Sequence, residues 1–200
     1  YFGGEYAYHY MPRHLDYFDV ETFNNNPMEF WAVCTNVGTG KAVYKRLMEV
    51  DNNCLEYIRA SASMPIAARI VTVEGKKLLD GGIADSIPLR FFQEQGYDRN
   101  LVVLTQPANY VKEPNKLMPL MRLWLRRHPR IIRALEQRHI MYNNQLEYVR
   151  QEEKKSNTLV LRPEAALTIG HLSHNPDDMQ ATYEHGRKVA TKHLEEIKAF

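Results

Sequence analysis

Asp80, Gly81 and Gly82 are the residues of this sequence whose types and spacing best fit a catalytic group. An extended apolar run ends at Lys77–Leu79, so we expect Asp80 to lie where a buried strand stops. The two glycines that follow allow backbone angles that other residues resist. Open α/β sheets place their chemistry at the ends of strands, and a carboxylate held there can serve as a general base.

The segments on either side make this motif more specific. An Ala- and Ser-rich segment closed by proline, Ala60–Pro65, precedes the strand, and Ile83–Pro88 follows the glycines and leads into a helix. In this combination the chain resembles the patatin-like phospholipase family. A second, weaker match is the pattern Phe23–Phe30, which carries Pro27 and Glu29.

The resemblance implies a patatin-like fold, in which a mostly parallel central sheet is flanked by helices. It also implies a serine acyl hydrolase that uses a Ser-Asp pair with no histidine between the two. On this resemblance Asp80 is the general base, and Gly81 and Gly82 position it. The expected substrate is a phospholipid or another lipid ester, and neither a cofactor nor a metal is expected.

The serine of such a pair is not found in these 200 residues. The resemblance implies a Gly-x-Ser-x-Gly elbow upstream of Asp80, and no serine here has glycine at both two-residue offsets. The serines considered are Ser61, Ser63, Ser86, Ser156 and Ser173. Because the sequence also begins with Tyr, we expect residues 1–200 to be the C-terminal portion of a patatin-like domain, with a helical extension from about residue 115. Alone, this portion is expected to hydrolyse no ester.

Three other patterns favour ordinary structure over a site. His9 and His14 have no Cys or carboxylate cluster at metal-ligand spacing, so we interpret them as loop histidines. Gly38–Lys41 lacks the longer glycine spacing and the following helix of a phosphate loop, which leaves a turn. His171–His174 contains two histidines and a serine, but the sequence supplies no partners for a metal site or a Ser-His pair.

Local patterns predict an α/β protein, because short apolar runs alternate with segments of helical period. Residues 1–27 show no sustained period and predict connecting structure with at most a short helix near Arg13–Phe18. The run Leu101–Thr105 is typical of a buried parallel strand. The other expected strands are Phe30–Asn36, Ala42–Met48, Arg69–Val73, Lys77–Asp80 and Asn157–Leu161. The expected helices are Asp51–Ser63, Leu89–Gln95, pieces of Leu117–Arg150 broken at Pro119 and Pro129, and a final helix from Pro176 to the C-terminus.

Composition excludes several classes of protein. A chain of 200 residues with 44% hydrophobic content suffices for one domain with a sizeable core. The net charge of +2 provides no global field for nucleic acid, and no nucleic-acid motif accompanies the arginines of Arg122–Arg138. Cys34 and Cys54 fit no metal or disulfide spacing, which favours a reducing compartment. With no secretion signal and no apolar run of spanning length, the expected location is cytoplasmic or peripheral to a membrane.

A basic amphipathic stretch offers a surface for such a peripheral contact. Between residues 122 and 135 arginines alternate with large apolar side chains, which suits an anionic lipid surface, although a helix that simply covers the sheet has the same pattern. The arginines concerned are Arg122, Arg126, Arg127, Arg130 and Arg133. Two alternatives stay open beside the lipid hydrolase: a catalytically inactive lipid-binding or interaction module on the same fold, and a hydrolase of soluble esters.

Overall fold

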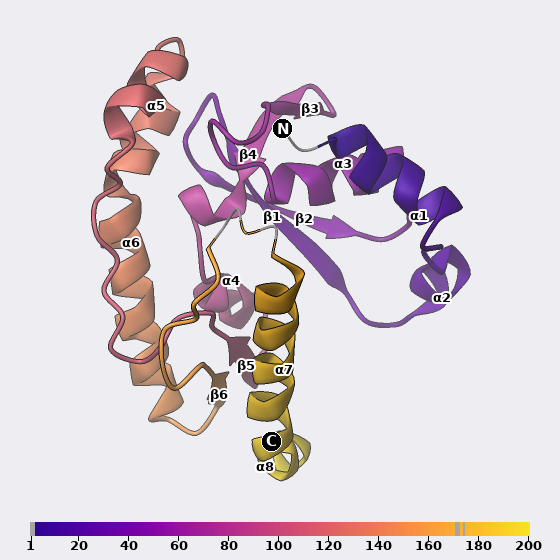
Figure 1. Cartoon of the computed structure of the whole chain (residues 1–200), viewed down its shortest axis with the longest axis vertical. Helices are drawn as coiled ribbons and strands as arrows, with labels where there is room; N and C mark the ends of the chain where they lie inside the picture. The colour runs from indigo at the N-terminus through magenta and orange to yellow at the C-terminus, as the bar shows by residue number, and fades with distance from the viewer. Residues whose placement is uncertain (1–2, 171–172, 174) are drawn as a thin grey trace. The chain divides into compact units, whose positions relative to one another are not determined.

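A computed structural model describes residues 3–170, 173 and 175–200 of the chain as a mixture of helices and two sheets (Figure 1). The predicted combination of helices and sheets is therefore confirmed. The chain divides into two compact units. The first contains the residues up to Ile87 together with Glu113–Tyr142, and the second contains Pro88–Lys112 and Asn143–Phe200.

The first unit is built on a four-stranded antiparallel sheet. Its strands follow the order β2-β1-β4-β3. Their bounds are Phe30–Asn36 for β1, Ala42–Leu47 for β2, Val71–Val73 for β3 and Lys76–Asp80 for β4. All four predicted strands and both predicted hairpins are confirmed. The sequence suggested a mostly parallel central sheet, but parallel pairing occurs among the described strands only in the second unit.

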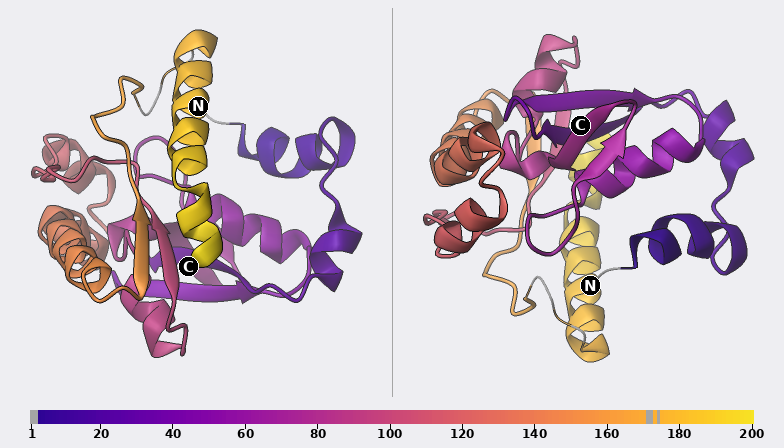
Figure 2. Two further views of the ribbon diagram at one scale, coloured as in Figure 1. Left: turned by 90° about the horizontal axis from the view of Figure 1, so that it is seen from below. Right: turned by 90° about the horizontal axis from the view of Figure 1, so that it is seen from above.

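One face of this sheet is covered by helix α3, Asn52–Ser61, as Figure 2 shows. The Asp51 side chain caps the helix by accepting a hydrogen bond from the Cys54 N–H at 2.7 Å. The core on this face brings together small and aromatic side chains. Its buried members are Ala32, Cys34, Leu47, Cys54, Tyr57, Ala60, Val71, Val73 and Leu78.

The opposite face is covered by two helices from later in the chain, α5 (Met118–Trp124) and the first half of α6 (Pro129–Glu153). Side chains alternate along a strand, so Leu78 belongs to the α3 core and Leu79 to this second one. The buried residues of the second core are Val37, Leu79, Ile83, Met121, Leu125, Ile131 and Leu135. Pro129 begins α6, as expected, whereas Pro119 lies in the first turn of α5, where a missing N–H costs nothing.

The N-terminal residues contain more helix than expected. A π-helical segment, Tyr6–Tyr10, continues into α1 (Met11–His14), and α2 covers Val20–Asn25. The prediction of at most one short helix near Arg13–Phe18 was therefore wrong. Aromatic rings four residues apart account for the first helical run, since Tyr10 contacts both Tyr6 and His14. The Asp19 side chain caps α2 by accepting from the Thr22 N–H.

The second unit contains the parallel pair β5 (Asn100–Val103) and β6 (Thr158–Leu161). Its helices are α4 (Leu89–Glu94), the second half of α6, α7 (Pro176–Lys192) and α8 (Leu194–Ala199). The parallel direction of β5 was predicted correctly, but its burial was not. Leu101 is 46% exposed and Val103 69%, because one face of this two-stranded sheet lacks a cover among the described residues. Within those same residues, no helix is both long and apolar enough to cross a membrane.

Candidate functional site

Asp80 is the last residue of β4 and lies opposite Cys34 of β1. Its backbone is fixed on both sides. The Asp80 N–H donates to the Ser63 carbonyl at 2.9 Å, and the Thr35 hydroxyl donates to the Asp80 carbonyl at 2.8 Å. The end of the strand is thereby tied to the segment after α3 and to β1, which gives the carboxylate a defined place.

The Asp80 carboxylate is half-buried and accepts the Gly82 N–H at 2.7 Å. Burial raises the pKa of Asp80 above its usual value, and the Gly82 hydrogen bond and the charge of Arg138 oppose that rise. A carboxylate with raised proton affinity is a better base for a hydroxyl group than one in free solution. The geometry therefore fits a group that accepts a proton and is held in one orientation by its neighbour's amide.

Gly81 and Gly82 form a 3₁₀ turn, Gly81–Ile83, directly after the strand. The sequence suggested that these glycines supply unusual backbone angles, but neither has a positive φ. Gly81 is required for a different reason, which is space. A Cβ at this position would lie 2.6 Å from the Val33 carbonyl carbon and nearer still to its oxygen. Only glycine lets the turn approach β1 this closely.

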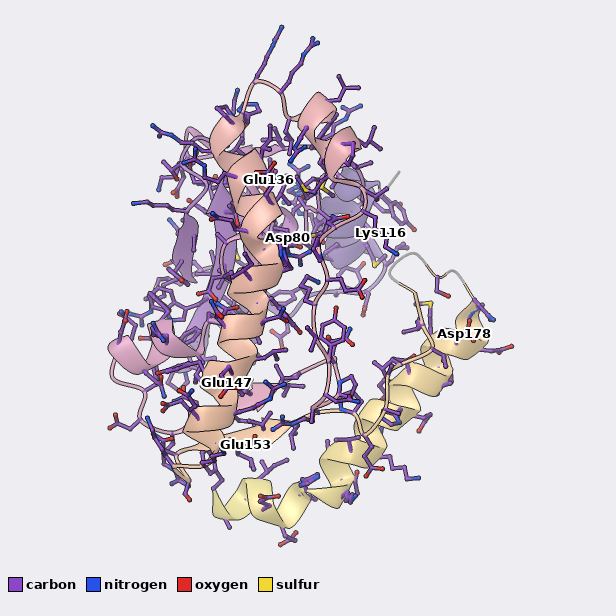
Figure 3. The ribbon with its side chains drawn as sticks, turned by 90° about the vertical axis from the view of Figure 1, so that its left-hand side faces the viewer. Asp80, Lys116, Glu136, Glu147, Glu153 and Asp178 are labelled. Atoms are coloured by element: carbon purple, nitrogen blue, oxygen red, sulfur yellow. The ribbon has the colours of Figure 1, made fainter. Side chains whose placement is uncertain are left out.

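The carbonyl of Gly82 accepts two hydrogen bonds. One comes from the Ser86 hydroxyl at 2.7 Å, and the other comes from Nε of Arg138 at 2.7 Å. Arg138 lies on α6, and Figure 3 shows Asp80 beside the half of that helix that carries Glu136. Sequence reasoning gave Arg138 no part in the site, because a contact across 56 residues leaves no local pattern.

Cys34 is the second ionisable side chain next to Asp80. It is completely buried, and its thiol donates weakly to the Tyr57 carbonyl at a distance of 3.6 Å. Burial, with a contribution from the Asp80 charge, raises the pKa of Cys34 to about 12. The thiol is therefore neutral at physiological pH and does not act as a nucleophile.

The serines around the turn are engaged with the main chain. Ser61 donates to the Val33 carbonyl, Ser63 to the Arg59 carbonyl and Ser86 to the Gly82 carbonyl, each at 2.7 Å. These hydrogen bonds stabilise the floor of the site. They point to structural roles for these serines, which also lack the Gly-x-Ser-x-Gly spacing of a catalytic elbow.

The remaining candidates lie apart from Asp80. His9 contacts Glu56 at 2.8 Å, and the His14 ring lies against Tyr10. Gly38–Lys41 forms a turn between two strands, as predicted, with Gly40 at φ +69°. The histidines of His171–His174 lie outside the described residues. In the part of the chain that is described, no group of three or more His, Cys, Asp or Glu side chains is arranged to hold a metal ion.

The five arginines predicted to meet a membrane are all exposed, on α5, on α6 and on the turn between them. Figure 3 shows side chains tipped with nitrogen extending from that turn. Arg122 is paired with Glu136 at 2.6 Å, and Arg130 donates to the Gly38 carbonyl at 3.3 Å. These arginines lie close to one another along the chain, and the partners of Arg122 and Arg130 are residues other than Asp80.

Comparison with known proteins relates two segments of the chain to families. Residues 128–200 match a family described as a domain of unknown function, DUF6363. A curated relative, the "Uncharacterized protein YjjU" of Escherichia coli (strain K12), is 30% identical over 112 residues, which cover 50% of this chain. The chain spans about a third of that relative, because the aligned part is 31% of its length.

The other match coincides with the sheet and the Asp80 turn. The family described as patatin-like phospholipase matches residues 10–92, which include β1 to β4, α3 and the glycines at 81 and 82. The resemblance predicted from the sequence is therefore confirmed for residues 10–92, which match the patatin-like phospholipase family.

Proposed function

We propose that this protein is a lipid acyl hydrolase in which Asp80 is the general base of a Ser-Asp pair. The family match suggests hydrolysis of lipid esters. The observation that carries the role of Asp80 is its setting: a half-buried carboxylate at a strand end, oriented by the Gly82 N–H at 2.7 Å. A serine hydroxyl becomes a strong nucleophile when such a base takes its proton.

The proposed reaction has two halves. In the first, a serine outside residues 1–200 attacks the ester carbonyl while Asp80 accepts the hydroxyl proton, and the alcohol leaves with that proton as an acyl-serine forms. In the second, water attacks the acyl-serine and gives a proton to Asp80, which returns it to the serine oxygen as the fatty acid departs. Gly81 and Gly82 act as positioning residues throughout.

The arrangement of the domain is part of the proposal. Residues 1–200 form the C-terminal portion of the patatin-like domain, with a helical extension from about residue 115. The pair β5 and β6 belongs to a mostly parallel sheet whose other strands lie outside this chain. The exposure of Leu101 and Val103 supports a missing cover on one face of this sheet, because parallel sheets are normally covered on both faces.

Contact with an anionic membrane completes the proposed function. The chain has no acidic residue between positions 117 and 135, and Glu136, just beyond that stretch, pairs with Arg122 at 2.6 Å. Apolar side chains accompany the arginines of this stretch, since Leu123 is 65% exposed and Trp124 44%. Arginine at the level of the headgroups beside Leu and Trp is the pattern of an interfacial surface. The surface comprises Arg122, Arg126, Arg127, Arg130 and Arg133.

The proposal is tested in the full-length protein with Asp80→Asn. Asparagine keeps the shape and the hydrogen bond to the Gly82 N–H but removes the basicity, so kcat on a phospholipid or p-nitrophenyl ester is expected to fall about 10² to 10⁴-fold. Labelling by a fluorophosphonate, which needs an activated serine, is expected to fall in parallel. Asp98→Asn, the same change at an exposed aspartate, serves as the control and is expected to change neither.

Each alternative function has its own outcome in this experiment. Wild-type kcat and labelling in Asp80→Asn contradict the role of Asp80. Failure of the wild-type protein to hydrolyse any ester or to react with the fluorophosphonate, with vesicle binding retained, favours a lipid-binding module on the same fold. Equal turnover of short soluble esters and of esters in vesicles favours a hydrolase of soluble substrates.

A further inference from the structure

Arg138 reaches the Asp80 turn from a distant part of the sequence. It lies on the first half of α6, and its side chain is half-buried against the turn. Its Nε donates to the Gly82 carbonyl at 2.7 Å. A Cβ built at Gly82 would lie 3.4 Å from Nη2 of Arg138, so the guanidinium also covers the face of that glycine.

Gly82 is held through both of its polar groups. Its N–H donates to Asp80, and its carbonyl accepts from Arg138 and from Ser86, each of the three bonds being 2.7 Å long. A carbonyl oxygen has two lone pairs, and both have a donor here. Rotation of Gly82 would break all three hydrogen bonds, so its N–H remains directed at the carboxylate.

Arg138 also sets the charge around the carboxylate. The groups that face Asp80 are the neutral Cys34 thiol on β1, the Gly82 N–H in the turn and the Arg138 guanidinium on α6. Arginine side chains in proteins carry a permanent positive charge. The charge of Arg138 lowers the pKa of Asp80 and so opposes the effect of burial.

We propose that Arg138 is a positioning residue of the Asp80 site, holding Gly82 by its carbonyl and placing a permanent positive charge near the carboxylate. This inference rests on the proposed function. It assigns a role within the hydrolase site to the segment 128–200, whose family has no known function. The site would then be shared between the patatin-like segment and the segment that follows it.

The test uses the full-length protein and the pH dependence of kcat/KM. Arg138→Gln removes the charge and is expected to lower kcat/KM about 10-fold at neutral pH, since a hydrogen bond from a charged donor is lost. The acid limb of the profile should move to higher pH, because the carboxylate loses a nearby positive charge. Arg138→Lys retains a charge and should keep the limb close to wild type while kcat is reduced. Lys154→Gln removes an exposed cation as a control and should change neither quantity.

Structural damage and a role at the site give different results. An Arg138→Gln variant that melts at a lower temperature but keeps the wild-type acid limb overturns the inference. If Arg138→Gln does not fold, Arg138→Lys decides: reduced kcat with an unmoved limb supports the inference, and wild-type kcat overturns it. If Asp80→Asn loses activity but Arg138→Gln keeps the wild-type pH profile, only the role of Arg138 is refuted. If Asp80→Asn keeps the wild-type kcat, the proposed function itself is refuted.

Discussion

Two regions of the first unit differ in how they are held, the Asp80 turn (Asp80–Ile83) and the α5–α6 tip (residues 117–133). In the turn, Gly81 lies against β1, Gly82 is hydrogen-bonded through its N–H and its carbonyl, and Asp80 is hydrogen-bonded through its backbone and its side chain. In the tip, arginine, leucine and tryptophan side chains extend from the surface. Rigid surroundings suit a group whose orientation decides a reaction rate, and exposed side chains suit a surface that must adapt to lipid.

At the tip, the large effect is expected on membrane binding. Replacing Arg126, Arg127 and Arg130 by Gln should lower the partition of the protein onto anionic vesicles about 100-fold at low ionic strength, since each charge near such a surface contributes about 1 kcal/mol. Co-sedimentation with vesicles of phosphatidylglycerol and phosphatidylcholine measures it, and added salt should shrink the difference.

The matched control for this experiment replaces three exposed lysines elsewhere, Lys154, Lys188 and Lys198, by Gln. It removes the same total charge and should weaken vesicle binding much less. Equal losses in the two triple variants would mean that net charge, and not the tip, determines binding. The turnover of a soluble ester should be unchanged in both, because neither variant touches the Asp80 turn.

The next effect concerns stability at the turn. Gly81→Ala places a methyl group against the Val33 carbonyl and is expected to lower the free energy of unfolding by about 2 kcal/mol or more, because backbone must move. Gly82→Ala meets side-chain atoms of Asp80, Arg138 and Ser86 at 3.0 to 3.5 Å and should cost under about 1 kcal/mol. Denaturant unfolding of both variants measures the difference, and equal losses would contradict the close approach of Gly81 to β1.

The smallest effect links the turn's chemistry to its stability. Because burial raises the pKa of Asp80 in the folded protein above its usual value of 3.8, the folded state binds the proton more tightly than the unfolded state. The free energy of unfolding therefore falls as the pH rises from 3.8 to the raised pKa of Asp80 in the folded protein. Asp80→Asn removes this loss, so the variant should match the wild type at pH below 3.8 and become the more stable protein at neutral pH. Thermal unfolding of both proteins across pH checks this prediction. A difference in stability between the variant and the wild type that does not change with pH would contradict it.

Local sequence patterns predicted much of the first unit. The bounds of β1 were predicted correctly, and α3 and the β3–β4 hairpin differ from their predictions by one to two residues at their ends. These elements have strong local signals, namely apolar runs between turn residues and a capping aspartate. The N-terminal helices lack an apolar period and are held by contacts such as His9 with Glu56, so they were missed.

The site was predictable only in part. The position of Asp80 at a strand end follows from the run before it and the glycines after it, and its catalytic role stays a prediction. The steric reason for Gly81 depends on the path of β1, and the hydrogen bond from Arg138 depends on the path of α6. The sequence near residue 80 does not indicate where β1 or α6 will lie, because tertiary packing decides which distant segments meet there.

The cover that α5 and α6 give to the sheet has a consequence for modularity. A boundary drawn after residue 92, where the patatin-like match ends, would separate Leu79 and Ile83 from the four residues that bury them, Met121, Leu125, Ile131 and Leu135. Truncation after residue 92 would expose an apolar face of the sheet to water and promote aggregation. The patatin-like segment therefore shares one folding unit with α5 and the first half of α6, although the family match ends before them, and a transfer between proteins must keep these parts together.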